Sequence, residues 1–298
     1  MWLKKPQTIT QEVHFLGDFN FSSYLVVGTR SLLVSGGVMA LGPAVHAQLK
    51  TILGEEGRLD YLVVSHAHFD AVGMVPHLRR MYPELQVLSS GATARSLSDP
   101  GQLRWIRQQN EDLITRYGKQ HRFPHVDLAY TSGLTIDRII APGETIDLGE
   151  RLKLEVFDAP GHCDGELALF HRGAKTLFVG DVLGWHSAPQ TCLVHFSHSY
   201  GDHKRAVGSL SELMPRRVAL SHFGVLNEAD AVRIFQLALD SAASQFDRIR
   251  QLLSRETPDE KICQELMATS YRDALRVLPV SSFLNGVRGM IAAVAREI

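Results

Sequence analysis

Four predicted strands of this sequence are each followed closely by a histidine or an aspartate, beside a glycine or another small residue, and this regularity limits the possible folds. These residues are His66, His68 and Asp70 after the run 59–64, His162 after 152–157, Asp181 after 176–179 and His222 after 217–220. Alternate residues at the end of a strand project the same way, so His66 and His68 can converge on one point. Imidazoles and carboxylates are good ligands for zinc and iron. The sequence therefore predicts a metal site where several strands end.

Strand-type and helix-type segments alternate before residue 228. The β-type runs are 12–16, 23–27, 31–35, 59–64, 86–89, 139–146, 152–157, 167–170, 176–179 and 217–220, and the helical runs are 42–53 and 76–81. Such alternation is typical of a layered α/β arrangement.

Two further regions are predicted to be helical. Residues 93–119 are polar, interrupted by Pro100, and long for a connector in a compact fold, so we expect an insertion that covers part of the molecule. After Asn227 an apolar stripe recurs every three or four residues, which indicates packing on the α/β body, with a homodimer face as the alternative. We therefore expect a domain of residues 1–227 and a helical extension of residues 228–298 that packs on it.

The composition argues against several classes of partner. With 31 Lys and Arg against 32 Asp and Glu, the formal net charge is −1, which gives no electrostatic reason to expect nucleic acid or an anionic membrane. The three cysteines include no CxxC pair, which favours a reducing compartment. Residues 1–6 lack the apolar stretch of a secretion signal, and no glycine-rich phosphate-binding motif occurs. We predict a cytoplasmic protein that acts on a small molecule.

The order of the histidines and aspartates resembles the metallo-β-lactamase superfamily, which carries an HxHxDH motif followed by single His, Asp and His positions. The resemblance extends over roughly residues 12–226. It implies an αββα sandwich with the metal site at one edge, between two sheets. It also implies the ligands, which are His66, His68 and His162 for a first metal, Asp181 as the bridge, and Asp70 and His222 for a second metal.

One position departs from the family pattern. Ala71 stands where the family has the last histidine of HxHxDH. A methyl group cannot coordinate a metal, so we expect a second site that is weaker, is completed by water or a substitute ligand, or is lost. Asp164, Glu166 and His186 are the candidate substitutes. One or two divalent metal ions, zinc or iron, are therefore the expected cofactors.

The resemblance also implies a hydrolytic reaction. A metal with three histidine ligands and an open position lowers the pKa of bound water towards ~7, so that hydroxide can attack a carbonyl carbon. Asp70 is the predicted catalytic residue, because it would orient the hydroxide or accept its proton. Length and helical additions resemble the subfamily of the quinolone signal response thioesterase. The expected substrate is therefore an ester or thioester of a small acyl compound, similar to an acyl-coenzyme A.

Two alternatives stay open. Residues 178–186 and 75–78 resemble the diiron domain of flavodiiron proteins, which implies a protein that responds to oxygen or nitric oxide, although His68 stands where those enzymes usually have glutamate. The second alternative follows from Ala71. Because a ligand is missing at this position, the metal site is degenerate and the protein could be a binding or regulatory module. His195 and His198 are interpreted as structural residues, with a place in a substrate pocket as the alternative. Cys163 is interpreted as a packing residue, not a nucleophile.

Overall fold

Two seven-stranded sheets form the centre of the computed structural model, which describes residues 2–117, 134–188 and 190–298. The first sheet has the order β1 (Trp2–Leu3), β16 (Val225–Asn227), β15 (Arg217–Ala219), β12 (Thr176–Phe178), β11 (Leu167–His171), β10 (Lys153–Asp158) and β9 (Thr145–Asp147). The second has the order β2 (Gln7–Thr8), β3 (Val13–Gly17), β4 (Ser22–Val27), β5 (Ser31–Val34), β6 (Tyr61–Val63), β7 (Gln86–Ser89) and β8 (Arg138–Ile139). Strands β5 to β8 are parallel neighbours, as are β12 and β15.

The two sheets pack face to face through an apolar core. Alternate residues of β3 and β4, such as Val13, Phe15, Tyr24 and Val26, all belong to this core. This follows from strand geometry, because successive side chains point to opposite faces of a sheet. Across the core, the ring of Tyr24 lies 5.7 Å from the ring of Phe178 in the first sheet.

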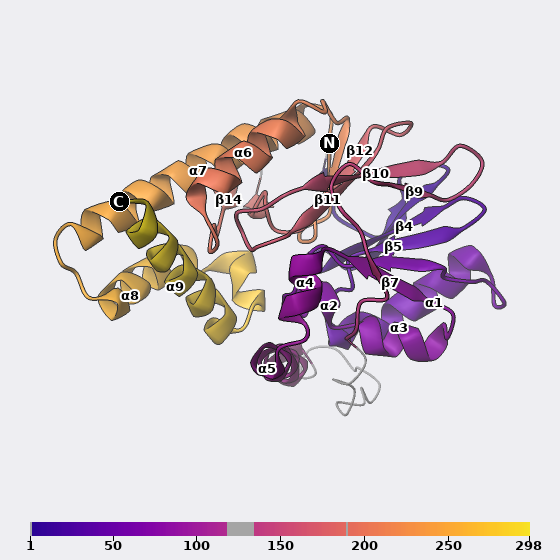
Figure 1. The fold of residues 1–298 in the computed structure, drawn as a ribbon, viewed down its shortest axis with the longest axis horizontal. Helices are drawn as coiled ribbons and strands as arrows, with labels where there is room; N and C mark the ends of the chain where they lie inside the picture. Colours follow the sequence, from indigo (N-terminus) through magenta and orange to yellow (C-terminus); the bar gives the residue numbers. More distant parts are fainter. Residues whose placement is uncertain (1, 118–133, 189) are drawn as a thin grey trace.

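Helices cover the two outer faces (Figure 1). The helices α1 (Gly42–Leu53) and α3 (Val75–Met81) lie against the second sheet, and α6 (Tyr200–Ser211) and α7 (Ala229–Leu253) lie against the first. Most of the apolar stripe on α7 is buried within the chain. The predicted αββα sandwich is therefore confirmed.

The predicted helical insertion consists of α4 (Gly91–Ser96) and α5 (Pro100–Tyr117), and its residues 118 and 119 lie outside the described residues. Pro100 begins the second helix, a position that suits proline. Beyond α7 follow α8 (Asp259–Ser270), the 3-10 turn η3 (Asp273–Val277) and α9 (Val280–Glu297). Ser281 donates a hydrogen bond to Gln109 on α5 at 2.8 Å, so the insertion and the C-terminal helices meet. No helix in the described part of the chain has the length and apolar character to cross a membrane.

One strand prediction is wrong, and several elements were not predicted. Residues 139–146 do not form one strand, because β8 ends in the second sheet and β9 begins in the first. Gly143 turns the chain between them with a φ of 88°, a conformation that glycine adopts without steric cost. The unpredicted elements are β1, β2, η1 (Met39–Leu41), α2 (Phe69–Val72), the hairpin of β13 (Trp185–Ala188) and β14 (Thr191–Leu193), α6, β16 and η3.

Candidate metal centre

The six residues that the sequence singled out as ligands lie together, after strands of both sheets. His66 and His68 follow β6, and Asp70 lies on the short helix α2 behind them. The other three follow strands of the first sheet and are His162 after β10, Asp181 after β12 and His222 after β15. Five of the six are buried, and His68 is half-buried.

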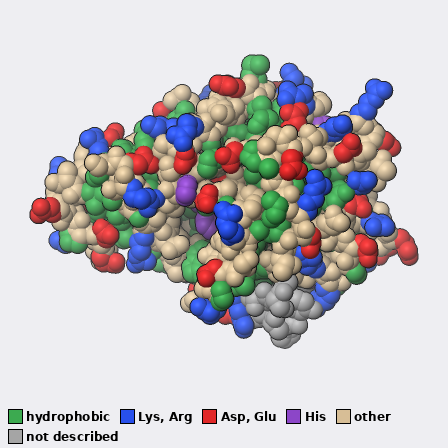
Figure 2. Space-filling view, viewed as in Figure 1, with side chains coloured by type: hydrophobic (Ala, Val, Ile, Leu, Met, Phe, Trp, Pro, Cys, Tyr) green, Lys and Arg blue, Asp and Glu red, His purple; other side chains and the backbone are tan. Residues whose placement is uncertain are grey.

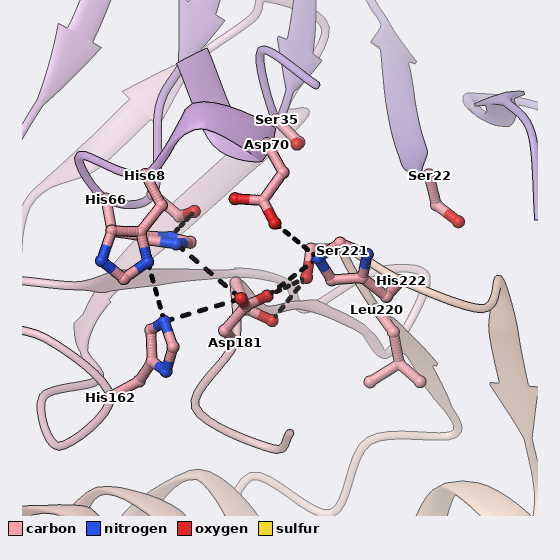
Figure 3. A network of polar contacts seen from close by, with 12 residues as sticks. Ser22, Ser35, His66, His68, Asp70, His162, Asp181, Leu220, Ser221 and His222 are labelled. Carbon is pink, nitrogen blue, oxygen red and sulfur yellow. Dashed lines mark hydrogen bonds and ion pairs between the residues drawn. The ribbon is translucent and has the colours of Figure 1, made fainter. Parts of the chain in front are cut away.

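A first group consists of His66, His68, His162 and Asp181, each of which offers one ligand atom within 4.8 Å of the others. The Nε2 atom of His162 lies 3.0 Å from Nδ1 of His68 and 3.6 Å from Oδ2 of Asp181. Nε2 of His66 lies 3.9 Å from the same carboxylate oxygen. Figure 3 shows the three imidazoles on one side of Asp181.

A second group consists of Asp70, Asp181 and His222, whose ligand atoms also lie within 4.8 Å of one another. Nε2 of His222 lies 3.3 Å from Oδ2 of Asp70 and 3.5 Å from Oδ1 of Asp181. Asp181 therefore turns one oxygen towards each group and stands between them (Figure 3).

Hydrogen bonds on the far side of the rings set their orientation. Nδ1 of His162 donates to the backbone oxygen of His195 at 2.8 Å, and Nδ1 of His222 donates to the backbone oxygen of Asn20 at 2.7 Å. The neutral form of each ring then presents an unprotonated Nε2 to the centre, the arrangement usual for metal-binding histidines. Ser221 donates to Oδ1 of Asp181 at 2.6 Å and holds the bridging carboxylate in the same way.

The two groups differ in charge. Burial, together with neighbouring imidazoles, lowers the pKa of His66 and of His68 to about 3, so both rings are neutral at pH 7. Burial alone would also lower the pKa of His222, but Asp181 and Asp70 outweigh it and raise this pKa to about 9. Burial opposes ionisation of Asp181, yet the facing imidazoles, His222 first, hold the pKa of Asp181 below its usual range. At neutral pH His66 and His68 are therefore neutral and ready to bind a cation, whereas the second group holds an ion pair.

Two buried ligand atoms have no hydrogen-bond partner among the residues that the structure describes, namely Nε2 of His66 and Oδ1 of Asp70. Buried polar atoms are nearly always paired, so these exceptions call for a ligand. Three imidazoles with a carboxylate are a donor set that zinc and iron accept. The first group therefore fits a divalent metal ion, and the second offers three donors for another.

The family model of the metallo-beta-lactamase superfamily matches residues 16–222. The chain belongs to this superfamily. A solved metallo-beta-lactamase family protein from Thermus thermophilus has the same fold, with a TM-score of 0.59 and 18% sequence identity over 94% of each chain.

Curated relatives carry different names. The chain is similar to the probable metallo-hydrolase YqjP of Bacillus subtilis, with 22% identity over 85% of this chain and 82% of that protein. It is 32% identical to the acyl-coenzyme A thioesterase MBLAC2 of Gallus gallus over 41% of this chain and 40% of that one. A nitric oxide reductase of Moorella thermoacetica is 24% identical over 62% of this chain and 44% of its own length. The chain thus spans less than half of the thioesterase and of the reductase.

None of the three candidate substitutes for the missing superfamily histidine at Ala71 belongs to either ligand group of the described residues. Glu166 is buried, but its Oε1 accepts a hydrogen bond from the backbone nitrogen of Val182 at 2.9 Å, so it supports the loop that carries Asp181. The ring of His186 packs 5.3 Å from the ring of Trp2. The second group therefore keeps the three donors Asp70, Asp181 and His222.

Trp185 was not predicted as a site residue, yet its ring lies 6.4 Å from the ring of His162 and 6.2 Å from that of His222. His195 lies behind it, with ring centroids 4.7 Å apart. His198 is exposed and lies 3.9 Å from Asp202. Burial and the neighbouring Glu166 raise the pKa of Cys163 well above its usual value, which agrees with a packing role and not with a nucleophile.

An approach to the centre lies beside His68. A cavity of about 430 Å³ is lined by His68 and by residues of α4, α5 and the loop after His162, including Arg95, Gln102 and Asp164. Figure 2 shows histidine side chains at the surface where the C-terminal helices meet the sandwich. A small substrate can therefore reach a ligand of the first group from this side.

Proposed function

We propose that this protein is a metal-dependent hydrolase that cleaves an ester or thioester of a small acyl compound. The observation that carries the proposal is the first group, in which three imidazoles and one carboxylate offer ligand atoms within 4.8 Å of one another. A divalent metal ion held there would lower the pKa of a coordinated water towards neutrality and so supply a nucleophile at neutral pH.

The residues of the chain have separate roles in this proposal. His66, His68 and His162 hold the metal, and Asp181 faces them with Oδ2. Asp70 is the residue that orients the attacking water or accepts its proton, because its buried Oδ1 has no partner within the described residues. The cavity beside His68 would receive the substrate.

The choice of an acyl substrate is supported by the relatives. One relative, which aligns with 41% of this chain, is named an acyl-coenzyme A thioesterase. Another, which aligns with 85% of it, is named a probable metallo-hydrolase. The buried metal centre in contact with an open cavity suits a compact acyl group better than a polymer.

The proposal is tested by hydrolysis of a panel of coenzyme A thioesters and nitrophenyl esters by the metal-loaded protein. We expect turnover that His66→Ala lowers at least about 100-fold, since removing even an outer partner of a ligand costs about 10- to 100-fold. His46→Ala, on α1 and outside both ligand groups, is the matched control and should keep full activity. A metal-loaded wild type that cleaves no member of the panel would overturn the proposal.

A second candidate is a diiron protein that responds to oxygen or nitric oxide. The observation that favours it is the likeness to a nitric oxide reductase, together with the three donors that remain in the second group. This candidate predicts two iron ions per chain, a visible absorption that changes with oxygen, and no acyl hydrolysis. A binding or regulatory module predicts neither metal nor hydrolysis.

A further inference from the structure

Two side chains beside the metal centre contain buried nitrogens without a hydrogen-bond partner among the described residues. These nitrogens are Nε1 of Trp185 and both ring nitrogens of His195. Trp185 is 6% exposed and His195 is 2% exposed. Because native proteins pair almost all buried polar groups, three unpaired nitrogens on two adjacent rings indicate a place for a ligand.

Trp185 borders the centre directly, and His195 lies next to it. Trp185 contacts one ligand of each group, since its ring lies 6.4 Å from His162 and 6.2 Å from His222. The ring of His195 lies 4.7 Å from Trp185, and its backbone oxygen accepts the hydrogen bond from His162. A molecule that reacts at the metal centre would therefore lie close to Trp185, with His195 beside it.

The surroundings of the pair are aromatic and cannot satisfy its nitrogens. The ring of His195 lies 5.0 Å from Phe283 on α9, and Phe283 lies 5.1 Å from Tyr271. Helix α9 approaches His195 closely, because a Cβ atom on Gly286 would lie 2.3 Å from Nδ1 of His195. The pair is thus closed on one side by the C-terminal helices, while the cavity beside His68 borders a different ligand of the first group.

The chemistry of the pair defines its ligand. An indole N–H only donates, and a neutral imidazole has one N–H donor of its own, so the atom that can pair with both donors is an oxygen with free lone pairs. On the basis of the hydrolase function proposed above, we propose that Trp185 and His195 form the acyl-binding wall and select acyl groups that carry an oxygen beyond the scissile carbonyl. A plain alkyl chain would leave the nitrogens buried and unpaired, and sites built to hydrogen-bond a substrate reject analogues that lack the partner.

The selection changes the substrate and not the reaction. The oxygen of water forms a bond to the acyl carbon, the carbon–sulfur bond breaks, and the thiol leaves with a proton, which gives a carboxylic acid and a free thiol. No electron is gained or lost. The additional oxygen of the acyl group takes no part in bond making.

The test compares two isosteric substrates, the methoxyacetyl and butanoyl thioesters of N-acetylcysteamine, which differ in one ether oxygen in place of a methylene. The ratio of their kcat/KM values is measured for wild type and for Trp185→Phe, so that the intrinsic reactivity of each thioester cancels. We expect wild type to prefer the methoxyacetyl thioester and Trp185→Phe to lower the ratio at least about 10-fold. His195→Gln, which keeps a donor and an acceptor, should retain more of the ratio than His195→Leu.

Trp105→Phe is the matched control, because this ring lies 6.0 Å from His68 but has no unpaired buried nitrogen. It should leave the ratio unchanged. If Trp185→Phe lowered kcat/KM equally for both thioesters, the inference would be overturned, since the indole N–H would then bind the carbonyl that the two substrates share. The metal content of each variant is measured alongside. If Trp185→Phe has lost its metal ion, the comparison of the kcat/KM ratios is made with His195→Gln and His195→Leu instead.

Binding of the product acids separates this inference from the proposed function. Calorimetric titration of the metal-loaded protein with methoxyacetate and with butanoate needs no turnover. A wild type that hydrolyses neither thioester nor any member of the panel, but binds methoxyacetate more tightly in a manner that Trp185→Phe removes, would refute the hydrolase and support the pocket. Equal binding of both acids by wild type and variant would refute the pocket.

Discussion

Binding of a second metal ion is expected to depend steeply on pH. Nε2 of His222 faces both carboxylates of the second group, and they raise its pKa to about 9. This proton must leave before the ring can coordinate a metal, because ligands bind deprotonated. At pH 7 only about 1% of the rings are neutral, so the second affinity is lower than above pH 9 by up to about 100-fold, or about 2.7 kcal/mol.

The first metal ion should behave differently. The pKa values of His66 and His68 are about 3, so both rings are already neutral at pH 7. Their affinity for metal should therefore change little between pH 7 and pH 9. The factor of about 100 for the second ion is an upper limit, because a cation in the first group lowers the pKa of His222 through their shared neighbour Asp181.

The assay is a competition titration of the metal-depleted protein with zinc and a chromophoric chelator at pH 7, 8 and 9. Calorimetry in buffers of different ionisation enthalpy counts the protons released. We expect about one more proton released with the second ion than with the first at pH 7. His222→Gln, which removes the titrating group, should make the second affinity weak and independent of pH. Equal second affinities at pH 7 and pH 9 in wild type would refute the reasoning.

Three further predictions concern the same centre. Ala71→His should raise the affinity for the second ion at least about 10-fold by adding a fourth donor, as measured by the same titration. The folded-state pKa of His222 lies above its unfolded value of 6.5, so the stability that this residue contributes is fully present below about pH 6.5 and is lost as pH rises through about 9. The metal-depleted protein should therefore lose stability between about pH 7 and pH 9. Melting temperatures across this range test this, and a flat profile would contradict it. Glu166→Leu should weaken metal binding about 10- to 100-fold, whereas Glu166→Gln, which can still accept from Val182, should not.

The strands that carry the ligands could be predicted because each is a short apolar run closed by a polar residue. The run 59–64 contains β6, and the segments before His162, Asp181 and His222 also form strands within one or two residues of the expected bounds. Distances between ligands could not be predicted, since they depend on how two sheets pack. The prediction of one strand over residues 139–146 failed for a local reason. Pro142 and Gly143 are typical of a turn, but the apolar residues on both sides made the segment look like one continuous strand.

The acyl-binding wall shows why the rest of the site could not be predicted from the sequence. Trp185 lies on the unpredicted hairpin of β13 and β14, and no spacing rule connects it with His162 or His222. His195 looked like a structural histidine, and in part it is one, because its backbone oxygen orients His162. The burial of its side chain could not be predicted, because it depends on Phe283, nearly ninety residues later in the chain. Phe283 packs against the ring and offers no hydrogen-bond partner to its two nitrogens.

The loss of one histidine at Ala71 leaves the geometry of the second group intact because the chain itself maintains that geometry. Backbone oxygen of Asn20 fixes His222, and the hydroxyl of Ser221 fixes Asp181, without any contribution from residue 71. What changes is the balance between a proton and a metal ion, both of which compete for Nε2 of His222. With only three donors the free energy of metal binding in the second group is smaller, whereas Asp70 and Asp181 still stabilise the protonated ring of His222. We therefore expect the same residues to hold one metal ion and an ion pair at neutral pH, and to accept a second metal ion in more basic solution.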